Sequence, residues 1–179
     1  EVVIEKLNTL NCSYTALPYP KNMNFLDINV LDKFIEDINL AGSIFSKANK
    51  VLCYHNHALE FQKINQEIIL ERIYNNTDNK YIQGEPDVYW IQKGGHDPIS
   101  WCKKLKNRLP LIHLKDFIML NEHESYYAEI GNGNLDIKNI IKEAELSGCK
   151  WYIVEQDECQ GDPFISIETS FNNLLKFVT

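Results

Sequence analysis

The stretch that decides the fold is VLCYHNHALEF, residues Val51–Phe61. Its first four residues are apolar and predict a buried strand, which stops at His55, Asn56 and His57, with Glu60 three residues further on. Parallel sheets carry metal-binding and proton-transfer groups at the carboxyl ends of their strands. The stretch therefore predicts an α/β protein whose chemical groups stand at strand ends.

Three later stretches repeat this pattern of an apolar strand followed by charged residues. They read YIQGEPDVYW (81–90), PLIHLKD (110–116) and WYIVEQD (151–157). Neighbouring parallel strands end at one edge of a sheet, so side chains at these ends are expected around one pocket. The candidates are Glu60, Asp87, His113 and Glu155.

Helical patterns alternate with these strands along the chain. Apolar residues at helical spacing predict a long amphipathic helix over Asp27–Lys50. Further helices are predicted over 67–74, 97–106, 136–146 and 166–177, and strands over 12–17, 50–57, 80–84, 109–115 and 150–155. This alternation predicts a parallel sheet covered by helices, with a long polar loop before the helix at 136.

The number of strand–helix units leaves two architectures open. Four or five units are predicted, whereas a closed (β/α)8 barrel needs eight strands and typically ~250 residues. A barrel would thus lack about three units at its N-terminus. An open doubly wound sheet would fit 179 residues, but the glycine-rich phosphate fingerprint often found there is absent.

Composition narrows the class of protein. Apolar residues make up 44% and charged residues 24%, typical of one globular domain. The net charge of −7 argues against a nucleic-acid partner or an anionic membrane, since both are polyanions. No apolar run approaches the ~18 residues of a membrane span. Five scattered cysteines, none in a CxxC pair, favour a reducing cytoplasm.

The four candidates suit a hard divalent cation. Three carboxylates and one imidazole are ligands for Mn²⁺, Mg²⁺, Co²⁺ or Zn²⁺ rather than for a soft metal. Any one carboxylate at a strand end could instead cap the next helix or form an ion pair. The repetition of the pattern is what favours a shared site.

Neighbouring residues could support such a site. His57 shares a strand face with His55 as long as the strand continues, and Lys115 shares the face of His113. Asp157 stands on the face of Glu155 by the same rule. For Asp116 the position predicts a turn or helix cap.

Five motifs, taken in order, resemble the sugar phosphate isomerase/epimerase family of the xylose-isomerase-like TIM-barrel superfamily. They read YHNHALEF, GEPDVYW followed by GGHDP, LIHLKDF, EIGNGNLD and WYIVEQD. The superfamily also contains inosose dehydratase and the apurinic endonuclease IV type. The resemblance runs from about Cys12 to the C-terminus. It implies one domain, residues 1–179, with the last four to five βα units of a (β/α)8 barrel.

The resemblance also implies a divalent metal, with Mn²⁺ expected first and Zn²⁺, Co²⁺ or Mg²⁺ as alternatives. The implied ligands are Glu60, Asp87, His113 and Glu155. For the first of these four ligands His55 is the alternative to Glu60, because many relatives place a glutamate where His55 stands. A second departure is Pro86, where relatives usually have leucine.

The implied activity is isomerisation or epimerisation of a small sugar, keto-sugar or sugar phosphate. A carboxylate would remove a proton next to a metal-bound carbonyl and return it to another carbon or face. Glu155 and Glu60 are the expected acid and base, and His57 or Lys115 would stabilise the developing oxyanion.

Other readings stay open. A dehydratase or lyase acting on a keto-sugar would share the first step. An incomplete barrel would expose two sheet edges, so the chain could be an inactive fragment completed by another chain or by a second copy. A metal-dependent nuclease is disfavoured by the negative charge and by only five histidines.

Overall fold

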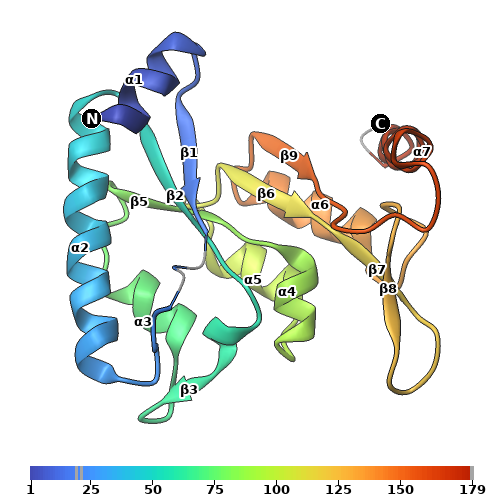
Figure 1. The fold of residues 1–179 in the computed structure, drawn as a ribbon, viewed down its shortest axis with the longest axis horizontal. Helices are drawn as coiled ribbons and strands as arrows, with labels where there is room; N and C mark the ends of the chain where they lie inside the picture. Colours follow the sequence, from blue (N-terminus) through green and yellow to red (C-terminus); the bar gives the residue numbers. More distant parts are fainter. Residues whose placement is uncertain (19, 21, 178–179) are drawn as a thin grey trace. The chain divides into compact units, whose positions relative to one another are not determined.

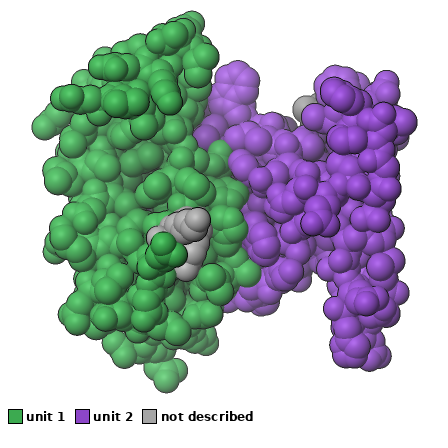
Figure 2. All heavy atoms as spheres, viewed as in Figure 1, with its two compact units in different colours: residues 1–85 green, residues 86–179 purple. Residues whose placement is uncertain are grey.

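The computed structural model describes residues 1–18, 20 and 22–177. Contacts divide the chain into two compact units, residues 1–85 and residues 86–179 (Figure 2). Each unit contains parallel strands accompanied by helices (Figure 1).

The first unit is built on a parallel sheet in the order β1-β2-β5. Its strands are β1 (Tyr14–Leu17), β2 (Val51–His55) and β5 (Ile82–Glu85). Leu52 of β2 pairs with Ile82 of β5, and both side chains are buried. The predicted parallel pairing is confirmed here, but β2 ends at His55, two residues before the predicted end at His57.

Helix α2 (Ile28–Lys47) runs along this sheet and contacts β2 and β5 (Figure 1). Asp27 caps it by accepting hydrogen bonds from the backbone N–H groups of Asn29 and Val30. Its apolar face is buried, as the spacing predicted. Gly42 allows close packing, because a Cβ there would lie 2.5 Å from the carbonyl oxygen of Tyr81.

Shorter elements complete the first unit. They are α1 (Val2–Thr9), the 3₁₀ turn η1 (Leu59–Phe61), β3 (Lys63–Ile64), β4 (Glu67–Ile68) and α3 (Ile69–Asn75). The helix predicted from residue 67 begins at Ile69, because residues 67–68 form an antiparallel hairpin with β3. Asn65 and Gln66 both have positive φ, 50° and 71°, as a two-residue hairpin turn requires.

The second unit contains a parallel pair, β6 (Leu111–Leu114) and β9 (Trp151–Val154). The chain entering the unit lies beside β6, since His113 donates its backbone N–H to the Pro86 oxygen at 3.0 Å. This unit also contains three helices, α4 (Val88–Lys93), α5 (Pro98–Lys104) and α6 (Ile137–Leu146). Helix α4 packs on β6, and α5 packs against both α4 and α6.

Three features of the second unit differ from the prediction. Helix α4 was not predicted, and its N-cap is Asp87. The predicted polar loop contains an antiparallel hairpin, β7 (Asp116–Met119) with β8 (Ser125–Ala128), whose aromatic and β-branched residues favour strand. Helix α7 (Pro163–Leu174) begins three residues earlier than expected, because Asp162 caps it and Pro163 fits its first turn.

None of the helices within the described residues is long and apolar enough to cross a membrane.

Candidate metal centre

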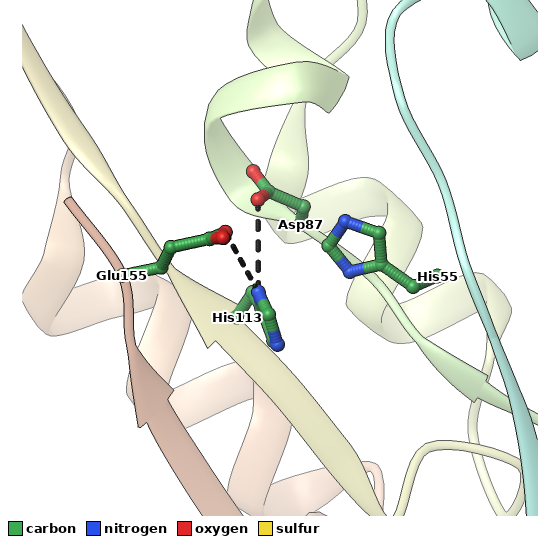
Figure 3. Close-up of side chains that lie close together, drawn as sticks. All are labelled: His55, Asp87, His113 and Glu155. Carbon is green, nitrogen blue, oxygen red and sulfur yellow. Dashed lines mark hydrogen bonds and ion pairs between the residues drawn. The ribbon is translucent and has the colours of Figure 1, made fainter. Parts of the chain in front are cut away.

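Three of the predicted ligands, Asp87, His113 and Glu155, lie together in the second unit (Figure 3). The Nδ1 atom of His113 is 3.0 Å from Oε2 of Glu155 and 3.9 Å from Oδ2 of Asp87. Each residue offers a ligand atom within 4.8 Å of those of the other two. Two carboxylates and one imidazole therefore converge on one position.

Backbone pairing brings these three residues together. Asp87 and His113 form an isolated parallel bridge, which aligns the start of α4 with β6. On the other side, the backbone N–H of Glu155 donates to the Leu114 oxygen at 3.0 Å, directly after β9 ends. This backbone pairing thus fixes the positions of all three Cα atoms, so the three side chains come together without long extensions of the chain.

Asp87 uses its two oxygens for different purposes. Oδ1 accepts the backbone N–H of Trp90 at 3.0 Å and caps α4, whereas Oδ2 is the oxygen that faces His113. Burial raises the pKa of Asp87 to about 7, although the Trp90 hydrogen bond and the charges of Lys115 and His113 oppose this shift. A bound cation would hold this carboxylate ionised.

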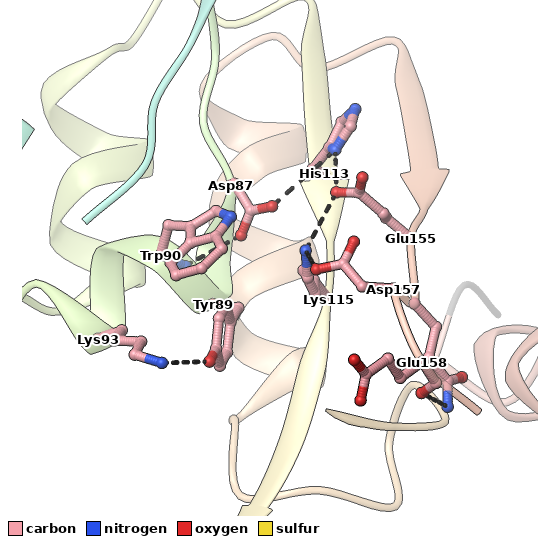
Figure 4. Close-up of polar contacts among 10 residues, drawn as sticks. Asp87, Tyr89, Trp90, Lys93, His113, Lys115, Glu155, Asp157 and Glu158 are labelled. Carbon is pink, nitrogen blue, oxygen red and sulfur yellow. Dashed lines mark hydrogen bonds and ion pairs between the residues drawn. The ribbon is translucent and has the colours of Figure 1, made fainter. Parts of the chain in front are cut away.

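Lys115 lies next to the cluster and is buried, with 2% of its side chain exposed. Its Nζ is 2.6 Å from Oδ2 of Asp157 and 3.5 Å from Oε2 of Glu155 (Figure 4). The aromatic rings of Tyr89, Trp90 and Tyr127 surround the ammonium at 5.7, 5.2 and 4.9 Å from their centroids. Such ring faces attract a cation and replace part of its hydration.

Polar contacts extend from Lys115 toward the surface. Burial raises the pKa of Tyr127, and hydrogen bonds of its hydroxyl with Asp157 and with Tyr89 raise it further. The Tyr89 hydroxyl accepts a hydrogen bond from Nζ of Lys93 at 2.9 Å (Figure 4). Tyr89 thus belongs to the polar network as well as to the packing.

The donor set fits a divalent cation. Carboxylate oxygens and an imidazole nitrogen are common ligands of Mn²⁺, Co²⁺ and Zn²⁺. Asp87 is fully buried, and a buried carboxylate close to a second one is costly unless positive charge compensates it. A divalent ion would supply that charge.

The remaining predicted site residues, Glu60, His55 and His57, belong to the first unit. Glu60 is fully buried, where its Oε1 accepts from the Tyr54 hydroxyl at 2.9 Å and its Oε2 from the His57 backbone N–H at 3.1 Å. Burial raises the pKa of Glu60 to about 7. Nδ1 of His55 lies 3.8 Å from Oε2 of Glu85.

Sequence reasoning predicted part of this arrangement and missed part of it. The expectation that Asp87, His113 and Glu155 lie together is met in the structure, while their role as ligands stays a prediction. Lys115 and Asp157 also lie with them. Tyr127 was missed, because it comes from a hairpin that was predicted as loop; the two adjacent tyrosines of SYYA, which favour strand, were the available signal.

Asp116 has the turn role that the sequence predicted. Its carboxylate accepts hydrogen bonds from four backbone N–H groups, at distances between 2.9 and 3.2 Å. The donors are Phe117, Gly131, Gly133 and Leu135. One buried side chain thus fixes the start of β7 against the loop that precedes α6.

The fold is that of xylose-isomerase-like TIM barrels, over about 60% of their length. No family model matches the chain. Solved structures nevertheless match nearly all of it, which confirms both the predicted fold class and the resemblance to sugar phosphate isomerases/epimerases.

Particular relatives can be named. A sugar phosphate isomerase/epimerase from Parabacteroides distasonis is 29% identical with a TM-score of 0.81, covering 96% of this chain and 60% of its own. A 3-keto-D-glucoside 4-epimerase from E. coli shares the fold at 14% identity, with a TM-score of 0.73 and coverages of 97% and 68%.

Curated relatives include two inosose dehydratases. The protein from Geobacillus thermodenitrificans is 25% identical over 150 residues, which is 74% of this chain and 50% of the relative. That from Clostridium tetani is 26% identical over 145 residues, which is 70% of this chain and 47% of the relative. The chain therefore spans about half the length of these curated relatives.

Proposed function

We propose that this chain forms part of a metal-dependent isomerase or epimerase that acts on a small sugar, keto-sugar or sugar phosphate. The observation that carries the proposal is the convergence of Asp87, His113 and Glu155 beside the buried ammonium of Lys115. The similarity to a sugar phosphate isomerase/epimerase at 29% identity supports it. Enzymes of this kind need a Lewis acid, a proton-transfer group and a positive group for developing negative charge.

The proposed cofactor is a divalent metal, Mn²⁺ in first place, with Zn²⁺, Co²⁺ and Mg²⁺ as alternatives. Asp87, His113 and Glu155 are the proposed ligands in the second unit. The resemblance implies a fourth, for which Glu60 is the first candidate and His55 the alternative. A bound metal would polarise a substrate carbonyl and make the neighbouring C–H more acidic.

The chain's own residues would then move the proton. Glu155 is the proposed base, and its 37% exposed side chain keeps it accessible to a substrate. Glu60 is the proposed second acid or base; its pKa of about 7 is near that of an effective proton-transfer group at neutral pH. The ammonium of Lys115, or else His57, would stabilise the oxyanion.

Metal content is the first test of this proposal. The purified chain is expected to hold about one Mn, Zn or Co per molecule by mass spectrometry, and the Asp87→Ala/His113→Ala double variant is expected to hold none. Asp97→Ala/His96→Ala is a matched control from the segment before α5. Failure to take up metal after soaking with Mn²⁺ would refute the proposed site.

Proton transfer is the second test. Because the chain spans only part of its relatives, exchange of one substrate C–H for deuterium is a more sensitive readout than full turnover. We expect the metal-loaded chain in D₂O to catalyse this exchange in a ketose, and Glu155→Gln to lower its rate at least about a hundredfold. Equal exchange by the variant would remove Glu155 from this role.

A dehydratase or lyase acting on a keto-sugar is the second candidate, because the curated relatives are named inosose dehydratases. It would share the proton abstraction but release water. NMR of the product separates the two activities, since only dehydration removes a carbon–oxygen bond. The chain could also require a complementing chain or a second copy for activity.

We propose a cytoplasmic location as well. All five cysteines are free thiols in the structure, which fits a reducing compartment. The proposed partner is a small molecule, and a nucleic-acid partner is disfavoured by the net charge of −7.

A further inference from the structure

The ammonium of Lys115 lies between two carboxylates at unequal distances. Oδ2 of Asp157 is 2.6 Å from Nζ, whereas Oε2 of Glu155 is 3.5 Å away (Figure 4). The nearer contact is a short charge-assisted hydrogen bond, and the farther one lies beyond good hydrogen-bond distance. Lys115 is therefore held mainly by Asp157.

The same oxygen of Glu155 also faces His113. Oε2 is 3.0 Å from Nδ1 of His113, so it is the oxygen that points into the cluster of donor atoms. An ammonium that moved onto Oε2 would occupy the lone pairs that a metal needs and would place a positive charge beside the ion. What holds Lys115 off Glu155 therefore affects metal binding.

The surroundings of Lys115 leave it few alternatives. The rings of Tyr89, Trp90 and Tyr127 enclose the ammonium, and its side chain is only 2% exposed. Water is thus a minor competitor, and the two carboxylates are the strongest acceptors within reach. Without the charge of Asp157, the ammonium would turn to Glu155, because an unpaired buried charge is costly.

We propose that Asp157 is a positioning residue, which keeps the ammonium of Lys115 off Glu155 and so leaves Oε2 of Glu155 available to the metal. This inference rests on the proposed role of Glu155 as a ligand. Asp157 itself binds neither metal nor substrate in this role, and it acts through Lys115. The hydrogen bond of Asp157 with Tyr127 helps to hold the Asp157 carboxylate in place beside Lys115.

A double-mutant cycle on metal affinity tests the proposal. The dissociation constant for Mn²⁺ is measured by calorimetry for the wild type, Asp157→Asn, Lys115→Met and the double variant. Methionine matches the length of lysine without its charge, and Asp157 is 41% exposed, so it stays hydrated when Lys115 is replaced. Glu158→Gln is the control, because it removes a nearby carboxylate charge that does not contact Lys115 (Figure 4).

The expected results are specific. Asp157→Asn weakens Mn²⁺ binding about tenfold, the lower end of what outer-sphere partners of metal ligands contribute. In the Lys115→Met background the same substitution changes affinity by less than about twofold, since the two residues act as one unit. Equal weakening in both backgrounds, or equal weakening by Glu158→Gln, would mean a plain charge effect and would overturn the inference.

A measurement without metal separates this inference from the proposed function. The ¹³C chemical shift of the Glu155 carboxyl group is expected to move in Asp157→Asn and to return in the double variant. An unchanged shift in Asp157→Asn would overturn the inference. If the wild type binds no Mn²⁺, the proposed function fails, and this shift still decides whether Asp157 holds Lys115 off Glu155.

Discussion

The imidazole Nδ1 of His113 lies 3.0 Å from Oε2 of Glu155, across the parallel pair of β6 and β9. Their register places His113 opposite Ile153, and Glu155 follows two residues later, just beyond the last strand residue. An imidazole and a carboxylate at neighbouring strand ends are positioned by backbone hydrogen bonds rather than by flexible loops. This rigidity is what a ligand set needs.

Metal stabilisation should depend on the cluster. An ion present at a hundred times its dissociation constant stabilises a folded protein by about 2.7 kcal/mol. We expect Mn²⁺ to raise the melting temperature of the wild type. The melting temperatures of His113→Gln and Asp87→Asn should be the same with and without Mn²⁺. Asparagine still caps α4, so Asp87→Asn changes the metal site more than the helix.

The control for this prediction is Asp97→Asn, because Asp97 caps α5 through Ile99 and Ser100 but lies outside the cluster. Its melting temperature should still respond to Mn²⁺. A response of His113→Gln equal to that of the wild type would place the ion elsewhere. Scanning fluorimetry with and without Mn²⁺ measures both outcomes.

Stability should fall between acid and neutral pH through Glu60. Burial raises its folded-state pKa to about 7, above the unfolded value of ~4.3, so the folded state binds the proton more tightly. The stability that protonated Glu60 contributes to the folded state is therefore fully present below about pH 4.3, and it is lost as pH rises toward 7. The full loss would be about 4 kcal/mol at ~1.36 kcal/mol per pKa unit.

Glu60→Gln should flatten this dependence, because glutamine does not titrate. Urea unfolding at pH 5 and at pH 8 gives the free energy of unfolding for each variant. The change in this free energy between the two pH values is then compared among the variants. The exposed Glu36 supplies the control, Glu36→Gln, which should retain the wild-type slope. An unaltered slope in Glu60→Gln would show that another group is responsible.

The four hydrogen bonds of Asp116 should make it a large contributor to stability. Asp116→Ala leaves several backbone N–H groups without their acceptor, and each such loss costs about 1–3 kcal/mol when the group is buried. We expect a loss of at least about 2 kcal/mol in chemical unfolding, with Asp116→Asn milder because one oxygen remains.

Gly133 gives an independent test of the same loop. A Cβ at this position would collide with the Asp116 carboxylate and with the Phe117 oxygen, so Gly133→Ala should destabilise the chain. At Gly161 a Cβ would meet no atom within 4 Å, and Gly161→Ala should be nearly neutral. Equal stabilities of the two variants would contradict the close packing around Asp116.

Cysteine reactivity should follow burial. Burial raises the pKa of the Cys102 thiol to about 12 and that of Cys149 to about 11, so neither forms much thiolate at pH 8. Cys12 and Cys159 are partly exposed. Under native conditions iodoacetamide should therefore label Cys12 and Cys159 well before Cys102, as mapped by peptide mass spectrometry.

Labelling in urea is the control for this prediction, because unfolding should make the labelling rates of the five cysteines similar. Rapid labelling of Cys102 in the native chain would show that the packing of α5 against α6 opens easily. Slow labelling of Cys12 would show that its surroundings are more closed than the structure indicates.

The sequence alone determined the periodic features of this protein. Apolar runs followed by charged residues predicted parallel strands that end in chemical groups, and helical spacing predicted α2. It also pointed to Asp87, His113 and Glu155, because parallel strands in register bring their ends to one edge whatever the details of packing. These inferences depend on local periodicity, which a sequence records directly.

Only the tertiary structure decided what depends on distant partners. The ion pair of Lys115 with Asp157, the ring of Tyr127 beside that ammonium and the four N–H groups gathered by Asp116 join residues from separate segments. Short elements such as α4 also depend on packing more than on propensity, and the β7–β8 hairpin depends on packing as well as on its strand-favouring residues. Their physical cause is burial and pairing across the fold, which neighbouring residues in a sequence do not reveal.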